Sequence, residues 1–169
     1  MLPAFVTWLR DTALSQAFRV PQEWLWPTFE SIHFLGLALV LGVAGFFDVR
    51  LMGFFKAIPI RKAAEFLPLA KVGFALNLMT GLYFYIASPF QYSFNIAWWY
   101  KVFGLLLAVA NAAFFETMLK KKMVVLRDDE EPPMSFRIVG VLSLLAWLNV
   151  LWWGRMLPFW APPGGGADL

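Results

Sequence analysis

The chain of 169 residues is 60% hydrophobic and 18% aromatic, and only 15% of its residues are charged. A water-soluble domain is nearer to half apolar, so this composition predicts a protein embedded in a lipid bilayer. The absence of cysteine excludes disulfide bonds, thiolate metal ligands and a cysteine nucleophile. The net charge of +3 does not indicate a nucleic-acid partner, because the basic residues lie in short connections between apolar stretches and not on one soluble surface.

The segment 3–18 precedes the first long apolar stretch and has the pattern of an amphipathic helix. Phe5, Trp8 and Leu9 fall on one face, whereas Arg10 and Asp11 are available to water. Such a helix is expected to lie in the membrane interface rather than to cross the bilayer. The two charged residues also interrupt any apolar run that would resemble a secretory signal.

Four continuous apolar stretches follow, each near the roughly 20 residues that span about 30 Å of hydrocarbon. They cover residues 28–47, 66–87, 96–118 and 136–157. Continuous apolarity favours helices over a β-barrel, in which apolar and polar residues alternate. The sequence therefore predicts an all-α fold, a four-helix transmembrane bundle. It forms one membrane domain over residues 1–161, followed by a flexible tail at 162–169.

Basic residues are concentrated in the first and third connections between the crossings. These connections hold Arg50, Lys56, Arg61, Lys62, Lys71, Lys120, Lys121, Lys122, Arg127 and Arg137. Positively charged connections remain in the cytoplasm. This bias predicts that the first and third connections are cytoplasmic and that both chain termini lie outside.

Two further patterns concern packing within the membrane. Tryptophan and tyrosine residues at the outer ends of the crossings are typical of an interfacial aromatic belt. Small residues at helical spacing, such as Gly73 and Gly104, predict close helix contacts inside the bundle or at a dimer contact. The amides of Asn77, Asn111 and Asn149 are expected to form hydrogen bonds between helices.

The single histidine of the chain, His33, lies roughly 8 Å below the outer end of the first crossing, at 1.5 Å per residue. Glu30 precedes it by one helical turn. Lys101 and Arg155 lie at a similar level in the third and fourth crossings. Ionisable groups are costly in hydrocarbon, so these four residues, named the outer cluster below, are candidate cofactor-binding residues.

Several chemistries could use the outer cluster. His33 could ligate the iron of haem b, with Lys101 and Arg155 pairing with the propionates and Met79, Met156 or a partner chain supplying a second ligand. It could instead donate a hydrogen bond to a quinone headgroup, or take part in proton transfer. The alternative without a ligand is a hydrogen-bonded interfacial histidine beside lysine and arginine side chains that extend to the surface.

At the opposite end of the bundle, Asp48, Arg50 and Glu116 lie at the inner ends of the first and third crossings. Asp48 and Arg50 are too close in sequence for a favourable pair on one helix face. We therefore expect these residues to form ion pairs between different helices on the cytoplasmic side.

Two segments carry a resemblance to known families. The run Glu30-Ser-Ile-His33-Phe-Leu-Gly36-Leu-Ala and the run Asp48-Val-Arg50-Leu-Met-Gly53 resemble an uncharacterised bacterial family of small four-helix membrane proteins. The resemblance covers residues 24–115. It implies a four-helix fold in a bacterial inner membrane, without implying an activity.

The layout is more distantly similar to HemJ-type protoporphyrinogen oxidases and to the membrane domain of CopD-type copper-resistance proteins. In the former, a histidine of the first crossing and a lysine of the third function together with bound haem. His33 and Lys101, within Tyr100-Lys101-Val, match these positions. The chain lacks the further histidines of these oxidases, and one histidine without cysteine is a poor copper path. The resemblance thus carries over the two residues and not the oxidase activity.

These observations favour a redox-associated inner-membrane protein that binds haem or quinone near the outer leaflet. The alternative is a non-catalytic membrane subunit that packs in a larger complex or in a homo-oligomer. The sequence does not decide whether the chain is an enzyme.

Overall fold

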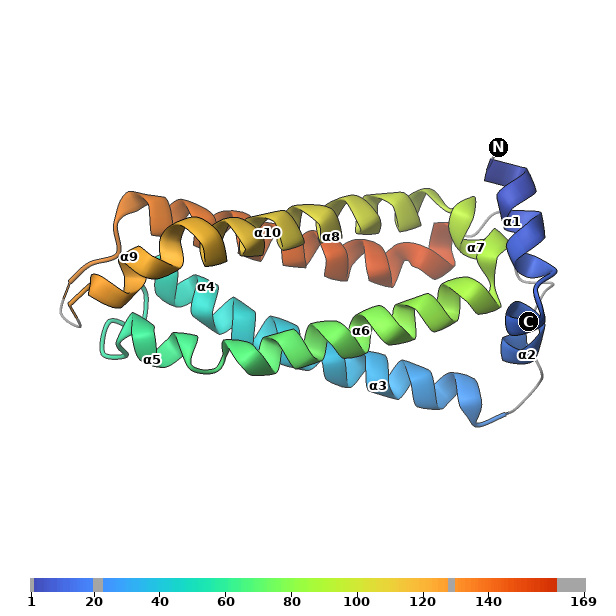
Figure 1. The fold of residues 1–169 in the computed structure, drawn as a ribbon, viewed down its shortest axis with the longest axis horizontal. Coiled ribbons are helices and arrows are strands. Elements are labelled where there is room, and N and C mark those ends of the chain that lie inside the picture. The colour runs from blue at the N-terminus through green and yellow to red at the C-terminus, as the bar shows by residue number, and fades with distance from the viewer. Residues whose placement is uncertain (1, 20–22, 128–129, 161–169) are drawn as a thin grey trace.

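The computed structural model describes residues 2–19, 23–127 and 130–160, and the regular structure of these residues is entirely helical. Leu25–Leu51, Ile60–Ala87, Ile96–Val125 and Met134–Trp160 are long and apolar enough to cross a membrane. These four stretches run side by side along the molecule (Figure 1). The predicted all-α, four-helix transmembrane fold is confirmed, and the chain is a multi-pass membrane protein. The tail at 162–169 lies outside the described residues.

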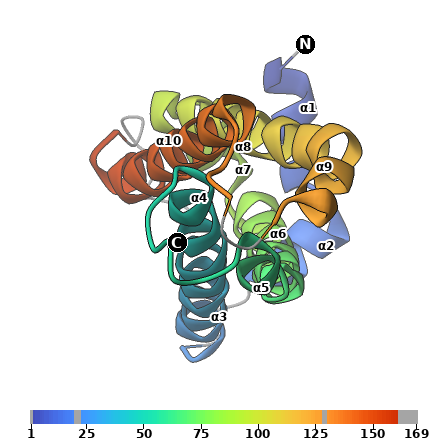
Figure 2. The ribbon, with the colours of Figure 1, turned by 90° about the vertical axis from the view of Figure 1, so that its left-hand side faces the viewer.

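The first stretch changes neighbours along its length. It consists of α3 (Leu25–Leu39), the π-helical segment η1 (Val40–Ala44) and α4 (Gly45–Leu51). Its first part, α3, packs on α6 (Leu67–Ala87), whereas α4 packs on α10 (Met134–Met156). The end-on view shows the same arrangement, with α4 next to α10 and α3 diverging from it (Figure 2).

The second and third stretches are also built from several segments. The second comprises α5 (Ile60–Ala64) and α6, and the short α7 (Pro89–Ser93) follows it. The third comprises α8 (Ile96–Phe114), a second π-helical segment η2 (Phe115–Leu119) and α9 (Lys120–Val125). The fourth comprises α10 and a 3₁₀ turn, η3 (Leu157–Trp160).

One side chain fixes the start of α8. The Asn95 side-chain oxygen accepts a hydrogen bond from the Ala97 N–H (2.9 Å), and its amide donates to the Leu157 carbonyl (2.9 Å). The first bond satisfies a free N–H group at the helix start, as an N-cap does. The second ties α8 to the end of the fourth stretch.

The N-terminal segment forms two helices instead of the one predicted at 3–18. The helices are α1 (Leu2–Arg10) and α2 (Ala13–Arg19). Between them, the Thr12 hydroxyl donates to the Leu9 carbonyl (2.7 Å) and accepts from the Ser15 N–H (3.2 Å). A threonine with these bonds competes with the helical pattern and caps the helix that follows. The prediction of a single helix is therefore wrong at this position.

Both N-terminal helices lie across one end of the bundle, together with α7 (Figure 1). The Ser15 hydroxyl donates to the Ile86 carbonyl (2.8 Å), and Arg19 Nε donates to the Ala87 carbonyl (2.8 Å). These bonds satisfy carbonyl groups at the end of α6 that have no partner within the helix. They hold α2 against α6.

Small residues lie where the helices cross most closely, as predicted. A Cβ atom on Gly73 would be 2.7 Å from the Gly36 carbonyl oxygen, and one on Gly140 would be 2.6 Å from the Asp48 carbonyl oxygen. The first contact joins α3 to α6 and the second joins α4 to α10. Absence of a side chain lets helix backbones approach in lipid, where no hydrophobic driving force joins them.

The membrane-embedded asparagine amides form hydrogen bonds either between helices or within one helix. Asn111 Nδ2 donates to the Val139 carbonyl (3.1 Å) and so joins α8 to α10, as expected. Asn149, in its hydrogen-bonded orientation, donates to the Tyr100 carbonyl (3.0 Å). Asn77 instead donates to the Gly73 carbonyl of its own helix (3.0 Å), so the expectation of a bond between helices is wrong for this residue.

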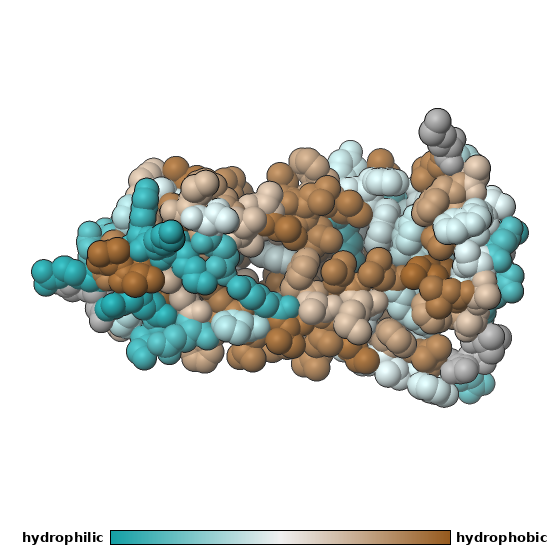
Figure 3. Space-filling model, in the orientation of Figure 1, coloured by the Kyte–Doolittle hydropathy of each residue, from teal (hydrophilic) through white to brown (hydrophobic). Residues whose placement is uncertain are grey.

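The surface divides into an apolar middle and a charged end. Apolar residues cover the central part of the bundle, and hydrophilic residues gather at the end formed by α5 and α9 (Figure 3). There, Glu131 accepts hydrogen bonds from Lys56 and from Arg137 (2.7 Å to the latter). These two cations hold the pKa of Glu131 below its usual range. The acidic connection before α10 is thus paired with the basic connection after α4.

Candidate functional site

The outer cluster predicted from the sequence is only partly assembled. His33 Nδ1 lies 2.7 Å from the Thr80 hydroxyl, which donates its hydrogen to the Leu76 carbonyl (2.7 Å). With that hydrogen used, Nδ1–H of His33 is the donor and Nε2 carries the lone pair. The His33 ring also packs edge-on against Phe84, with 5.9 Å between centroids.

Each of the three other residues of the outer cluster contacts an aromatic side chain. Glu30 is exposed and accepts a hydrogen bond from Trp26 Nε1 (3.2 Å), so it does not orient His33. Arg155 is exposed and lies over the Phe159 ring, 5.3 Å from its centroid. Lys101 is partly buried, with Nζ 6.0 Å from the centroid of the Trp98 ring.

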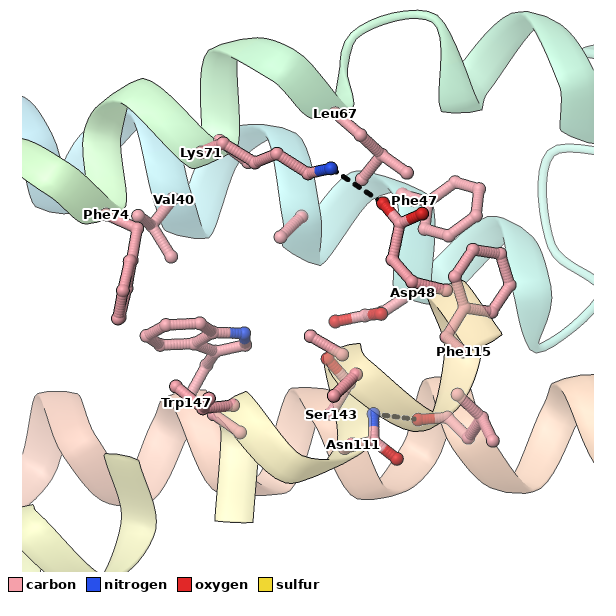
Figure 4. Close-up of a pocket in the computed structure, with 18 of the residues that line it drawn as sticks. Val40, Phe47, Asp48, Leu67, Lys71, Phe74, Asn111, Phe115, Ser143 and Trp147 are labelled. Atoms are coloured by element: carbon pink, nitrogen blue, oxygen red, sulfur yellow. Dashed lines mark hydrogen bonds and ion pairs between the residues drawn. The ribbon is translucent and has the colours of Figure 1, made fainter. Parts of the chain in front are cut away.

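A cavity of about 340 Å³ lies at the other end of the bundle. It is enclosed by η1 and α4, α6, α8 and η2, and α10 (Figure 4). Its walls are mainly apolar, and four aromatic side chains contribute to them: Phe47, Phe74, Phe115 and Trp147. A largely apolar cavity with a few polar groups is the usual form of a small-molecule site.

Polar groups converge on one part of this cavity, which we name the Asp48 cavity. The Asp48 side chain is 4% exposed, and its Oδ2 has no hydrogen-bond partner among the described residues. The Ser143 hydroxyl faces the Asp48 carboxyl group (Figure 4). The indole N–H of Trp147 also points into the cavity (Figure 4). A ligand in the cavity would therefore meet hydrogen-bond donors and an acceptor together.

The cavity opens between α6 and α8. These helices pack on α3 and α10, respectively, and have no extensive contact with each other within the described residues. The lining residues Val109, Ala112 and Ala113 are exposed on this side. An ion pair crosses the gap, because Lys71 Nζ lies 2.7 Å from Glu116 Oε1 (Figure 4). The α8 edge of the opening is thus apolar, and an ion pair spans the gap beside it.

The expected ion pairs at this end are correct for Glu116 and wrong for Asp48 and Arg50. Glu116 pairs with Lys71 and, through its other oxygen, with Lys120 (2.7 Å). Arg50 Nε donates to the Ile58 carbonyl instead, and no cation of the described residues pairs with Asp48. The reason is geometric: Arg50 faces the loop that follows its own helix, whereas Asp48 faces the cavity.

Both π-helical segments contribute to the cavity wall. Val40 and Ala44 line it from η1, and Phe115 and Glu116 line it from η2. A π-helical turn contains an extra residue, costs stability and is frequent at functional sites. The sequence indicated Asp48 as an ionisable residue at the inner end of the first crossing, but it carried no recognisable sign of the cavity or of the π-helical turns.

A comparison with models of protein families identifies a family that matches the chain. The model of a family of unknown function, DUF6644, matches residues 18–160. The protein belongs to the DUF6644 family. No curated protein and no solved structure matches the chain. Among the described residues of the DUF6644 protein, no group of three or more histidine, aspartate or glutamate side chains could hold a metal ion.

Proposed function

We propose that this DUF6644 protein binds a small, lipid-soluble molecule within the membrane, and that the ligand occupies the Asp48 cavity. The observation that carries the proposal is a cavity of about 340 Å³ in which a buried carboxyl oxygen has no partner. A buried polar group without a partner costs stability, so it is retained where a ligand supplies the missing partner. The opening between α6 and α8 gives such a ligand access from the bilayer.

Filling the cavity tests this proposal. Ala108 is 1% exposed and lines the cavity from α8, so Ala108→Leu is expected to occupy the ligand space. Ala110→Leu is the matched control, because Ala110 is exposed on the same helix. Ala70→Leu provides a second filling variant on the opposite wall, should Ala108→Leu fail to fold.

The measurement is the thermal stability of the detergent-purified protein with two probes of equal shape, neutral neopentylbenzene and cationic benzyltrimethylammonium. At least one probe should raise Tm of the wild type and of Ala110→Leu, by about 2–4 °C for each kcal/mol of binding energy. Neither filling variant should respond. Equal shifts in all four proteins, or a shift in none, would contradict the proposed site.

A second candidate function concerns the outer cluster. His33 Nε2 is free to accept a hydrogen bond, and Lys101 has no acidic partner within 4 Å among the described residues. An acceptor and a donor suit the hydroxyl and carbonyl groups of a quinone-type headgroup. We propose His33 and Lys101 as a site for such a headgroup. The resemblance to HemJ-type oxidases, in which a histidine and a lysine function together, is in keeping with this site.

The described residues fit haem less well than quinone. His33 is the only histidine of the chain, so a second imidazole ligand would have to come from another molecule. The Met79 side chain is 67% exposed and so is turned away from the interior. Glu30 and Arg155 are exposed and engaged elsewhere.

An absorption spectrum separates these two cofactors. Protein purified from haem-replete cells is expected to show only aromatic absorption, and an organic extract is expected to contain quinone that decreases in Lys101→Met. A Soret band that shifts on dithionite reduction and disappears in His33→Ala would instead establish haem ligation. Absence of both haem and quinone would leave the outer cluster as a packing feature.

We also propose a location in a bacterial inner membrane with both termini outside. The support is the concentration of lysine and arginine residues at the α5 and α9 end of the bundle, since such residues remain cytoplasmic. Under this orientation the Asp48 cavity lies in the inner half of the membrane and the outer cluster lies in the outer half. A role as a non-catalytic subunit or as a homo-oligomer would be favoured if neither site binds a ligand.

A further inference from the structure

We infer that the ligand of the Asp48 cavity is a small organic cation, namely an ammonium ion with an apolar substituent. The inference rests on the proposed function, because it assigns a charge to the ligand of the same cavity. Three features carry it: a buried carboxyl oxygen without a partner, the absence of an ion pair between Asp48 and any cation of the described residues, and a wall of aromatic rings.

Asp48 is a buried acid without a counter-ion. Its side chain is 4% exposed, and its Oδ2 has no partner among the described residues. The Ser143 hydroxyl faces the carboxyl group from α10, but it carries no charge. A buried carboxylate is costly unless a cation pairs with it, so the cavity has the greatest affinity for a ligand that brings a positive charge.

None of the cations near Asp48 forms an ion pair with it among the described residues. From α6, Lys71 pairs with Glu116 of η2, and Lys120 of α9 pairs with the same carboxylate. The Lys71 and Lys120 side chains are 66% and 51% exposed, so both extend towards the surface. On its own helix, Arg50 donates from Nε to the Ile58 carbonyl, and its buried Nη1 has no hydrogen-bond partner among the described residues. A monovalent cation would therefore supply the charge that the protein does not.

The aromatic wall suits the same ligand. Phe47 and Phe115 meet edge-on with 5.2 Å between ring centroids, and Phe74 and Trp147 meet edge-on at 6.3 Å. All four rings line the cavity. Aromatic faces attract ammonium groups, and this attraction is stronger when water is excluded. The apolar part of the ligand would fill the remaining apolar volume.

In this arrangement protonation of Asp48 opposes binding of the cation. The neutral carboxylic acid no longer attracts the cation, so lowering the pH should weaken binding. The nearest other titratable groups, Lys71, Glu116 and Lys120, are paired with one another. The pH dependence should therefore disappear when Asp48 alone is replaced.

The test is isothermal titration calorimetry of the full chain in detergent, with benzyltrimethylammonium as the cationic probe. Neopentylbenzene, which has the same shape without the charge, is the matched neutral probe. The protein variant is Asp48→Asn, which retains the size of the side chain. Titrations are made at about pH 8 and about pH 5, on either side of the range in which perturbed carboxyl groups titrate.

We expect the cationic probe to bind the wild type in preference to the neutral one. Its affinity should fall at least about tenfold in Asp48→Asn and on acidification of the wild type. Binding of the neutral probe alone, sensitive to Ala108→Leu and unaffected by Asp48→Asn, would overturn the cation assignment and leave the proposed site intact. Binding of neither probe would overturn both.

Discussion

Gly73→Ala is expected to destabilise the protein by about 1–3 kcal/mol, because the added methyl group overpacks the crossing of α3 and α6. A Cβ at this position would lie 2.7 Å from the Gly36 carbonyl oxygen and 2.7 Å from the Leu39 Cβ. One of these contacts is with backbone, so rotation of a side chain cannot relieve it. The two helices would have to separate.

Gly42→Ala is the matched control, because a Cβ on Gly42 would meet nothing within 4 Å. In a helix, alanine is favoured over glycine by up to about 1 kcal/mol, so this variant should be as stable as the wild type or slightly more stable. Both variants can be compared by their Tm in detergent, followed by size-exclusion chromatography. Equal Tm values for the two variants would show that α3 and α6 are packed less closely than the structure indicates.

Asp48→Leu is expected to stabilise the ligand-free protein by about 1–3 kcal/mol while abolishing binding of the cationic probe. The leucine removes a buried carboxyl group whose Oδ2 has no partner, and its methyl groups can enter the adjacent cavity of about 340 Å³. When a residue lowers the stability of the fold but binds a ligand, its replacement should raise the stability and lower the affinity for the ligand. The measurements are Tm without ligand and the calorimetric affinity.

Asp48→Asn gives the comparison for this second prediction. It removes the charge but keeps a polar group in the cavity, so its Tm should lie between those of the wild type and Asp48→Leu. A marked loss of stability in Asp48→Leu would mean that Asp48 is a structural residue held by its neighbours. The ligand-based interpretation of the cavity would then fail.

The helices were predictable because lipid imposes a simple requirement. Each backbone polar group must be satisfied internally, so a continuous apolar run of about 20 residues leaves little choice except a helix. The runs 66–87 and 96–118 correspond closely to α6 and to α8 with η2. The break at Asp11 and Thr12 was missed because it depends on hydrogen bonds of a single threonine side chain.

The candidate site was less predictable, because it depends on how the helices tilt and pack. The sequence placed His33 and Lys101 at one level, but it could not show that Thr80 is the hydrogen-bond partner of His33. It also indicated ion pairs between helices for Asp48, because Arg50 is too close in sequence to pair with it on one helix face. The structure shows that Asp48 faces a cavity instead, and only the three-dimensional packing of four stretches creates that space.

The π-helical segment η1 determines the angular position of everything that follows it in the first stretch. Each residue of an α-helix advances the chain by about 100° around the axis, so one extra residue in a turn shifts the phase of the next segment by that amount. η1 ends at Ala44, one helical turn before Asp48. With uninterrupted α-helical winding from Leu25, the carboxyl group would sit about a quarter of a turn away from the cavity. The winding of the backbone upstream thus directs Asp48 towards the cavity and towards Ser143 of α10.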